Sequence, residues 1–270
     1  MEDLTVVVTG ASSGVGLAAA QEFARRGARV VVVGRDPGRL RSAVDLVREA
    51  GGRTPDGFRA DFARLDDVRA LAAHLLDAYP KIDVLANNAG GIVPTYASTV
   101  DGFESTIQGN HLAPFLLTNL LRDRLSGGRV VNTASDAHRM GRVNPDDLVG
   151  DAARYSMWQA YGASKAANIL FAAEAGRRWP DVLSTAYHPG IVRSNFGAGT
   201  LATVFYKIAP FLTSPAGGAD TLVWLATAPA GEISQGGYYA KRRLRRPDPS
   251  ATDPDLAARL WEASAKAVGL

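Results

Sequence analysis

Residues 5–16 read TVVVTGASSGVG, a β-branched run followed at once by a glycine-rich turn. A continuous run such as Thr5–Val8 is typical of a strand that is buried on both faces. The glycines let the backbone turn sharply, and apolar residues at helical spacing follow. A helix that begins there offers unpaired N–H groups and its positive dipole end to a phosphate. We therefore expect a dinucleotide to bind this turn, a tight strand–helix turn without ligand being the alternative, and the missing Gly-Lys-Ser/Thr ending excludes a Walker loop.

Strand and helix patterns alternate through the first two thirds of the chain. We expect strands at 5–8, 29–33, 57–60, 82–86, 129–133 and 182–187. We expect helices at 17–26, 38–50, 65–78, 103–125 and 154–178, with Pro114 bending the fourth or lying at a break in it. Repeated βαβ units predict a doubly wound parallel sheet with helices on both faces. Because no linker or repeat is visible, residues 1–270 are interpreted as a single Rossmann-type α/β domain.

The composition excludes several classes of function. Apolar residues make up 46% of the 270 and charged residues 21%, as in an ordinary soluble protein. A net charge of +3 does not favour nucleic acid. The absence of cysteine excludes disulfides and thiolate chemistry. No signal peptide or membrane-length apolar stretch is visible, so we expect a cytoplasmic protein without membrane contact. The basic run 241–246 (KRRLRR) is interpreted as a solvated loop, or alternatively as a contact for an anionic partner or the active-site rim.

The end of the second expected strand bears on the choice of cofactor. An acid at this place binds the ribose 2′-OH of NAD, whereas an arginine can pair with the 2′-phosphate of NADP. The chain has Arg35 first and Asp36 next to it. We therefore expect NADP(H) to be preferred, with NAD(H) as the alternative.

Tyr161 and Lys165 are four residues apart, so on a helix their side chains share one face. A tyrosine titrates near pH ~10 and is a poor base at neutral pH. A neighbouring ammonium favours the phenolate and lowers the pKa. The spacing is common in structural helices, but it also suits a proton-transfer pair.

Several further motifs appear in a fixed order around this pair, and together they resemble the short-chain dehydrogenase/reductase family. The resemblance covers nearly the whole chain, and its pieces are TGASSGVG at 9–16, Asp61, NNAG at 87–90, Asn110, Ser135, YGASK at 161–165 and HPG at 188–190. The spacing of 26 residues between Ser135 and Tyr161 is longer than in many members. It resembles the retinol dehydrogenase-like branch, as do VNTASDAH at 131–138 and YGASKAANILF at 161–171.

The resemblance implies a role for each matching residue. Tyr161 would exchange a proton with the substrate oxygen, Lys165 would assist it and hold the nicotinamide ribose, Ser135 would bind the substrate oxygen, and Asn110 would hold a water that links Lys165 to solvent. The implied cofactor contacts are Gly10, Ser12, Ser13, Gly14, Val15, Gly16, Arg35, Asp61, Phe62 (through its backbone), Asn88, Ala89, Gly90, Tyr161, Lys165, Pro189, Gly190, Val192 and Ser194. Ser194 stands where the family often has threonine.

Some of these residues also have purely structural interpretations. Asp61 could cap the helix that begins at Leu65, and Ser135 could be a turn residue. Asn87 is expected to brace the sheet. The histidines His111, His138 and His188 are expected to be structural, since nothing pairs them with a nucleophile.

The expected reaction is reversible hydride transfer between the nicotinamide and the carbonyl or alcohol carbon of a small hydrophobic substrate. Residues 193–216 combine glycines and prolines with aromatic side chains, which suits a substrate lid or ordinary helical packing. The alternatives for the whole chain are an NAD-linked alcohol dehydrogenase and a non-catalytic dinucleotide sensor. Family members pair through the helices near 103–125 and 155–178, which implies a homodimer or homotetramer. No metal site is expected, and the role of the longer 136–160 stretch stays open.

Overall fold

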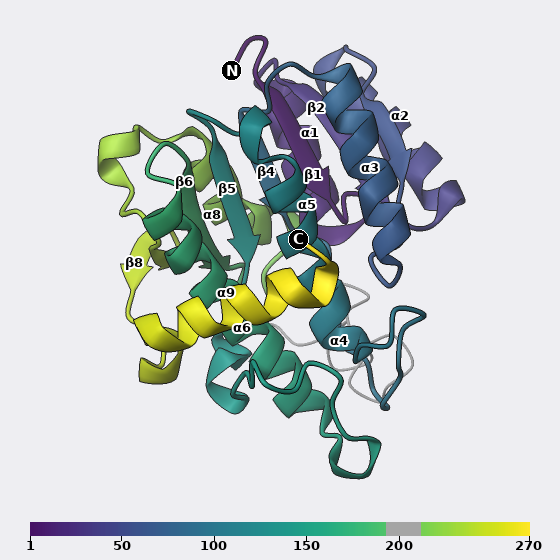
Figure 1. Ribbon diagram of the computed structural model, residues 1–270. Helices are drawn as coiled ribbons and strands as arrows, with labels where there is room; N and C mark the ends of the chain where they lie inside the picture. The colour runs from purple at the N-terminus through teal and green to yellow at the C-terminus, as the bar shows by residue number, and fades with distance from the viewer. Residues whose placement is uncertain (193–211) are drawn as a thin grey trace.

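The computed structural model describes residues 1–192 and 212–270, and they form one eight-stranded sheet between two layers of helices (Figure 1). The strand order is β3-β2-β1-β4-β5-β6-β7-β8. All neighbours are parallel except β7 and β8, which confirms the expected doubly wound sheet. The strands are β1 (Thr5–Thr9), β2 (Arg29–Gly34), β3 (Asp56–Arg59), β4 (Val84–Asn87), β5 (Arg129–Thr133), β6 (Leu183–His188), β7 (Tyr238–Ala240) and β8 (Arg243–Arg245).

Each face of the sheet is covered by its own set of helices. One core cluster joins the strands to α1, α2 and α8, and the other joins them to α3, α5, α6 and α9. The helices are α1 (Gly14–Arg25), α2 (Pro37–Gly51), α3 (Leu65–Ala78), α4 (Ser105–Ile107), α5 (Ala113–Leu120), α6 (Met157–Arg178), α8 (Pro215–Thr227) and α9 (Pro254–Val268). Figure 1 shows α3 and α9 in front of the sheet and α1 behind it.

The valine run of β1 is explained by burial on both sides. Val7 belongs to the cluster under α3 and α5, whereas Val6 and Val8 belong to the cluster under α1 and α8. All three side chains are inaccessible to solvent. An uninterrupted apolar strand is therefore needed here, because neither face of the sheet meets water.

The expected helix 103–125 is shorter than predicted and changes its hydrogen-bond pattern in the middle. The short α4 leads into a π-helical segment, Gln108–Leu112, and α5 follows. Pro114 has no N–H and therefore cannot close a helical turn onto the carbonyl of Asn110. The expected helix is therefore confirmed over residues 105–120, and Pro114 is accommodated by a π-helical turn without a gap in the helix.

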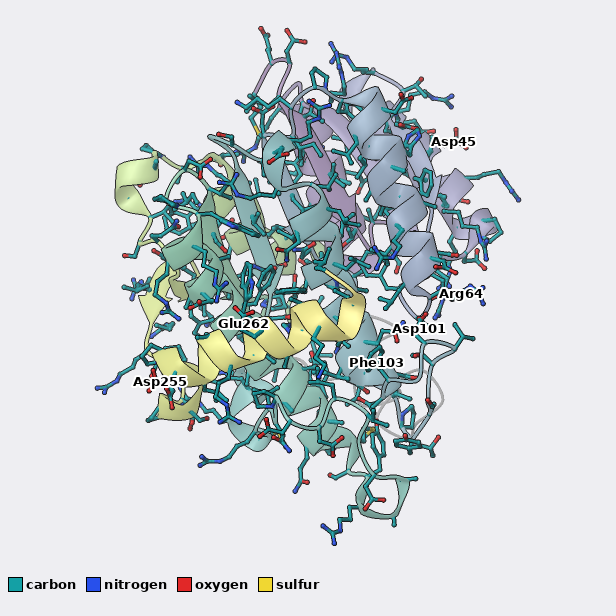
Figure 2. All side chains as sticks on the ribbon, viewed as in Figure 1. Asp45, Arg64, Asp101, Phe103, Asp255 and Glu262 are labelled. Atoms are coloured by element: carbon teal, nitrogen blue, oxygen red, sulfur yellow. The ribbon has the colours of Figure 1, made fainter. Side chains whose placement is uncertain are left out.

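Asp101 connects the π-helical segment to the start of α3, near Arg64 (Figure 2). Its Oδ2 accepts hydrogen bonds from the Leu65 backbone N–H (3.0 Å) and from Nε2 of Gln108 (2.7 Å). The side chain of Asp61 instead accepts from the Ala63 N–H. The interpretation of Asp61 as the cap of α3 is therefore wrong.

Helix α9 covers α5 and α6 on the outer side of the second layer. Its Trp261 meets the rings of Phe115 and Phe171, with centroids 5.0 and 5.7 Å apart. On the same helix Glu262 pairs with Arg178 of α6 at 2.7 Å (Figure 2). Sequence analysis expected another copy of the chain to pack on these helices, and α9 occupies part of that face instead.

The basic run 241–246 is a short hairpin, so the loop interpretation is wrong for its centre. Strand β8 is exposed and pairs antiparallel with β7. The two turn residues, Lys241 and Arg242, have φ of 53° and 57°, a region that hairpin turns normally fill with Asn or Gly. Arg242 is held in this conformation by an ion pair with Asp220 and by its N–H, which donates to Thr221 Oγ1 (3.2 Å).

Candidate active site

The glycine turn after β1 has the shape that the sequence predicts. Gly10 and Gly14 have φ of +65° and +56°, where side chains are disfavoured. A Cβ on Gly16 would lie 2.4 Å from the carbonyl oxygen of Gly10, and a Cβ on Gly10 would lie 2.8 Å from Cα of Ala89. Glycine is therefore required at these places by the close approach of three backbone segments.

The NNAG segment after β4 braces this turn. Oγ1 of Thr9 accepts from the N–H groups of Asn88 (3.0 Å) and Ala89 (2.9 Å), and Nδ2 of Asn88 donates to the Thr9 carbonyl (3.0 Å). The amide of Asn87 donates to Asn132 on the neighbouring strand β5 and to Thr118 on α5, which confirms its bracing role. The backbone N–H and the Nδ2 group of Asn88 already hold the turn, so a cofactor contact of Asn88 has to use other atoms of this residue.

The N-terminus of α1 faces this turn without a side-chain cap. Ser13 is the N-cap residue, its side chain makes no capping hydrogen bond, and the first turn holds no acidic residue. Uncapped N–H groups and the positive dipole end attract a pyrophosphate. The turn and the helix start therefore fit a dinucleotide, and Ser12, Ser13, Gly14 and Val15 lie in this turn or at the start of the helix.

The two charged residues after β2, Arg35 and Asp36, make different contacts. Asp36 is the N-cap of α2, and its Oδ1 accepts from the Arg39 N–H at 2.8 Å. That hydrogen bond holds the pKa of Asp36 below its usual value. Arg35 is 67% exposed and lies 3.9 Å from Asp61, while Nε of Arg59 donates to the Arg35 carbonyl (3.2 Å). The carboxylate is thus engaged by a helix, and guanidinium groups remain at the strand end.

Asp61 and Phe62 lie next to Arg35, at the end of β3. The Asp61 side chain is partly exposed, whereas the Phe62 ring is buried in the core beneath α3. The Phe62 ring is thus used by the core, and the contact of its backbone with an adenine stays a prediction.

Tyr161 and Lys165 lie on α6, one turn apart, at the carboxyl edge of the sheet. Lys165 is 3% exposed, and its Nζ donates to the carbonyl of Thr133 at 3.0 Å. The same Nζ lies 5.4 Å from the ring centroid of Tyr161. Burial lowers the pKa of Lys165 to about 8. A buried ammonium beside a phenol is the arrangement that the i,i+4 spacing predicts.

Ser135 follows β5 and begins the 3₁₀ helix Asp136–Met140. Its Oγ accepts from the Ala137 N–H (3.2 Å), so it is also the turn residue considered from the sequence. This short helix packs tightly against α6, because a Cβ on Gly162 would lie 2.6 Å from both the Ala137 oxygen and the Gly141 nitrogen. The first part of the 136–160 stretch therefore fixes the distance between Ser135 and the Tyr161 helix.

Gly162→Ala is expected to separate these two elements. The added methyl group overlaps backbone atoms that cannot swing away, so we expect the free energy of unfolding to fall by about 1–3 kcal/mol. We also expect a lower kcat, because Ser135 moves relative to Tyr161. Thermal unfolding and steady-state kinetics measure both, with Gly231→Ala, which meets no atom within 4 Å, as the control. Unchanged kinetics in a correctly folded Gly162→Ala would contradict this role.

Asn110 lies in the π-helical segment beside Lys165. Its Oδ1 accepts from the Gly91 N–H (2.8 Å), and its Nδ2 donates to the Gly91 carbonyl (2.9 Å) and to Ser164 Oγ (2.9 Å). A Cβ on Gly90 would lie 2.7 Å from that Oδ1 and 3.5 Å from Nζ of Lys165. The side chain therefore shapes the loop, and only the carbonyl of Asn110 is available for the expected water.

The expected nicotinamide side begins after β6. Gly190 has φ of +86°, and Val192 forms a parallel bridge with Thr213. A Cβ on Gly218 of α8 would lie 2.7 Å from Val192 and 2.9 Å from Val15, so α8 ties this segment to the glycine turn. Pro189, Gly190 and Val192 are thus placed beside the cofactor turn. Ser194 lies outside the described residues, as does all of the 193–216 segment except 212–216.

The histidines are placed as structural residues. His138 is buried, with Nδ1 at 2.7 Å from the Ser135 carbonyl, while Nε2 accepts from the Asp248 N–H (2.9 Å). His188 faces Asp136 at 3.5 Å, and burial lowers the pKa of both rings. Within the described residues, no cluster of three His, Cys, Asp or Glu side chains could hold a metal ion.

Comparison with known proteins agrees with this geometry. The family model for short chain dehydrogenase matches residues 4–203. The chain belongs to the short-chain dehydrogenase family. Within the described residues of this short-chain dehydrogenase, no helix is long and apolar enough to cross a membrane.

Two curated relatives of this short-chain dehydrogenase cover nearly all of it. A Streptomyces sp. (strain C5) protein, named as a candidate daunorubicin C-13 ketoreductase, DnrU, is 59% identical over 98% of this chain and 92% of its own length. Retinol dehydrogenase 14 of Mus musculus is 38% identical over 100% of this chain and 87% of its own. The expected retinol dehydrogenase-like branch is thus confirmed.

Solved structures place the same fold around a cofactor. An uncharacterised protein from Mycobacterium Paratuberculosis is 35% identical, with a TM-score of 0.81 over 99% of this chain and 94% of that one. A short-chain dehydrogenase from Escherichia coli CFT073, solved with NADPH, is 28% identical, with a TM-score of 0.66 over 84% and 91%. This short-chain dehydrogenase is accordingly an oxidoreductase that uses a nicotinamide dinucleotide and acts on an alcohol or carbonyl group.

Sequence analysis missed several residues that shape the site. The Thr133 carbonyl accepts from Lys165 and Asn168, Asn168 also donates to the Asn110 carbonyl, and Gly218 joins α8 to the glycine turn. The position of Asn168, three residues after Lys165 on one helix face, was visible in the sequence. The contacts of Gly218 were not, because they join segments that are distant along the chain.

Proposed function

We propose that this enzyme reduces a hydrophobic ketone with NADPH and that Tyr161 donates the proton. The observation that carries the proposal is the buried Lys165 ammonium beside the Tyr161 ring, at the strand edge that also holds Ser135 and the uncapped start of α1. A non-catalytic dinucleotide sensor would have no use for a buried cation beside a phenol. That alternative is therefore disfavoured.

Each residue has a separate task in the proposed reaction. A bound NADPH supplies the hydride that reaches the carbonyl carbon. Ser135 donates a hydrogen bond to the carbonyl oxygen and stabilises the negative charge that develops there. Tyr161 transfers its phenolic proton to that oxygen, and the Lys165 ammonium stabilises the phenolate that is left. The reverse sequence of proton movements oxidises the alcohol.

The preference for NADPH rests on the directions of Arg35 and Asp36. Because Asp36 caps α2, its carboxylate is not directed to a ribose hydroxyl, while Arg35 and Arg59 remain at the end of the strands. Guanidinium groups bind phosphate through charge-assisted hydrogen bonds. NAD-linked alcohol oxidation is the alternative that this arrangement disfavours.

Arg35→Ala is expected to weaken NADPH use selectively. Loss of one charge-assisted contact to the 2′-phosphate raises the KM for NADPH by about 10- to 100-fold. The KM for NADH should stay close to that of the wild type, because NADH lacks this phosphate. Steady-state kinetics with both cofactors test this, and Arg48→Ala on the far part of α2 serves as the control. An equal loss with both cofactors would argue against the 2′-phosphate site.

The substrate is proposed to be a large planar ketone of the anthracycline type. The ring of Trp158 is 37% exposed and stands edge-on to Tyr161, with centroids 6.5 Å apart. It offers an aromatic surface next to the proton donor, and the Streptomyces relative is named for the daunorubicin C-13 ketone.

The substrate proposal is tested by following NADPH oxidation with daunorubicin, with simple aromatic and aliphatic ketones and with retinal. We expect the highest kcat/KM for daunorubicin. Retinal is the second candidate, because mouse retinol dehydrogenase 14 is also similar over the whole chain. A preference for small aliphatic ketones would contradict the proposed substrate class.

Assembly and the lid are also proposals. The face of α5 and α6 that was expected to join copies into a homodimer or homotetramer is partly covered by α9. We therefore infer that any oligomer forms through another surface. A variant with an added charge on the exposed part of α6 should then sediment as the wild type does.

A substrate lid at 193–216 stays a prediction from composition.

A further inference from the structure

Asn168 is a buried amide on the same face of α6 as Lys165. It is 3% exposed, and its Nδ2 donates to the carbonyls of Asn110 (3.0 Å) and Thr133 (3.1 Å). These two hydrogen bonds use both amide hydrogens. One side chain of α6 therefore connects the end of β5 to the π-helical segment.

The Thr133 carbonyl is in direct contact with the Lys165 ammonium. The Thr133 oxygen also accepts from Nζ of Lys165 at 3.0 Å, so two donors share its lone pairs. The Asn110 carbonyl lacks the usual helical partner, because Pro114 has no N–H. Without Asn168 this carbonyl would lose the donor that fixes its direction.

The Asn168 amide is oriented by the two carbonyls, and it lies near the ring of His111. Burial lowers the pKa of His111 to about 4, so the ring is neutral at pH 7, and Nε2 lies 2.9 Å from Ser264 Oγ of α9. Nδ1 of His111 and Oδ1 of Asn168 are both buried without a hydrogen-bond partner of good geometry. The Asn168 amide nevertheless partly offsets the effect of burial on the His111 pKa, so the two side chains face each other.

The polarity of this pair follows from the chemistry of its atoms. Oδ1 of Asn168 can only accept, so it suits the His111 tautomer with its hydrogen on Nδ1, in which Nε2 accepts from Ser264. In this tautomer the amide oxygen points to His111 and the amide nitrogen to the two carbonyls. A flipped amide would bring its oxygen against both carbonyl oxygens.

We propose that Asn168 is a positioning residue of the active site, whose amide ties the Thr133 carbonyl to the Asn110 carbonyl and, through Thr133, positions the Lys165 ammonium. The inference rests on the proposed roles of Lys165 and Tyr161. It adds a requirement that these roles do not contain, namely a fixed Thr133 carbonyl as the acceptor of the ammonium. Small displacements of positioned groups lower turnover strongly, although substrate and cofactor still bind.

Asn168→Leu tests the proposal because it keeps the volume and removes both donors. We expect kcat to fall by about 10- to 100-fold, while the KM for NADPH and for the ketone change little. Asn168→Ser keeps one donor and should lose less activity, and it is the variant to use if the leucine variant does not fold. Wild-type kcat in either folded variant overturns the proposal.

Asn168→Asp provides a second readout through pH. The titratable groups around this position are Lys165 and Tyr161 on α6 and His111 on the π-helical segment, while β5 and α9 present Thr133 and Ser264. A carboxylate here favours the protonated forms of its neighbours. The acid limb of kcat/KM for alcohol oxidation should therefore move to higher pH, and an unmoved limb would count against the placement.

Gln235→Glu is the matched control, because it makes the same change of amide to carboxylate. Nε2 of Gln235 donates to the carbonyls of Val182 (2.7 Å) and Gly176 (3.3 Å), between α6 and β6 but away from Lys165. Its kcat and pH profile should stay those of the wild type. Tyr161→Phe in the same assay separates the two hypotheses. If that variant is inactive and Asn168→Leu is fully active, only the positioning role fails, and if Tyr161→Phe is active, the proposed function fails.

Discussion

Tyr161→Phe is expected to lower kcat for ketone reduction by about 10²- to 10⁴-fold, the usual contribution of a positioned acid or base. The ring and its contact with Lys165 remain, so the site keeps its shape and loses only the transferable proton. NADPH should still bind, since the glycine turn and the start of α1 are untouched. Steady-state turnover and NADPH fluorescence titration measure the two effects separately.

Tyr79→Phe is the control for this substitution. The hydroxyl of Tyr79 donates to Asp56 at 3.1 Å, at the end of the sheet remote from Tyr161. Its loss should affect stability slightly and turnover not at all. Undiminished turnover by Tyr161→Phe would show that another group delivers the proton.

Lys165→Met is expected to abolish most turnover while leaving the fold intact or more stable. The phenolate loses its neighbouring cation, so kcat should fall by about 10²- to 10⁴-fold, and the KM for NADPH should rise. Burial has lowered the pKa of Lys165 to about 8 in the folded chain, against about 10.5 in the open chain. Below pH 8 the fold therefore carries an ammonium that it has partly desolvated, and a methionine removes this penalty, worth about 1–3 kcal/mol.

The difference in stability between the wild type and Lys165→Met depends on pH, and the direction of this dependence tests whether burial of the Lys165 charge is unfavourable. Between pH 8 and pH 10.5 the unfolded wild type binds more protons than the folded one, so wild-type stability gains relative to Lys165→Met as pH rises. Thermal unfolding of both proteins at pH 7 and pH 10 measures this narrowing gap. A variant that is much less stable than the wild type at pH 7 would mean that the hydrogen bond to Thr133 outweighs the burial of the charge.

The first six strands and the order of the motifs could be predicted because each has a local pattern. The β-branched runs at 5–8 and 29–33 show burial on both faces directly, and the glycines of the turn reveal close backbone approach. The Tyr161–Lys165 spacing needed only helix geometry. The sequence places Arg35 and Asp36 side by side, and only the three-dimensional structure shows that Asp36 caps α2.

The rest depends on contacts between distant segments. β7 has three residues, too few to show a period, and it forms because β6 offers it an edge. Asn168 has an ordinary helical position, and its importance comes from Pro114 releasing a carbonyl on another segment. The turn at Lys241 and Arg242 contains no glycine, so local preferences argued against a hairpin, and the contacts of Arg242 with Asp220 and Thr221 come from a distant helix.

This hairpin leaves the outer edge of the sheet as a row of unpaired backbone groups on β8. Open edges invite strands of other molecules and so promote aggregation. The exposed side chains of Arg243 and Arg245 bring positive charge to that edge, and a second copy arriving in the same way would meet its own charge. Replacing both arginines by threonine should therefore leave kcat unchanged. The concentrated protein should form fibrous aggregates sooner than the wild type does.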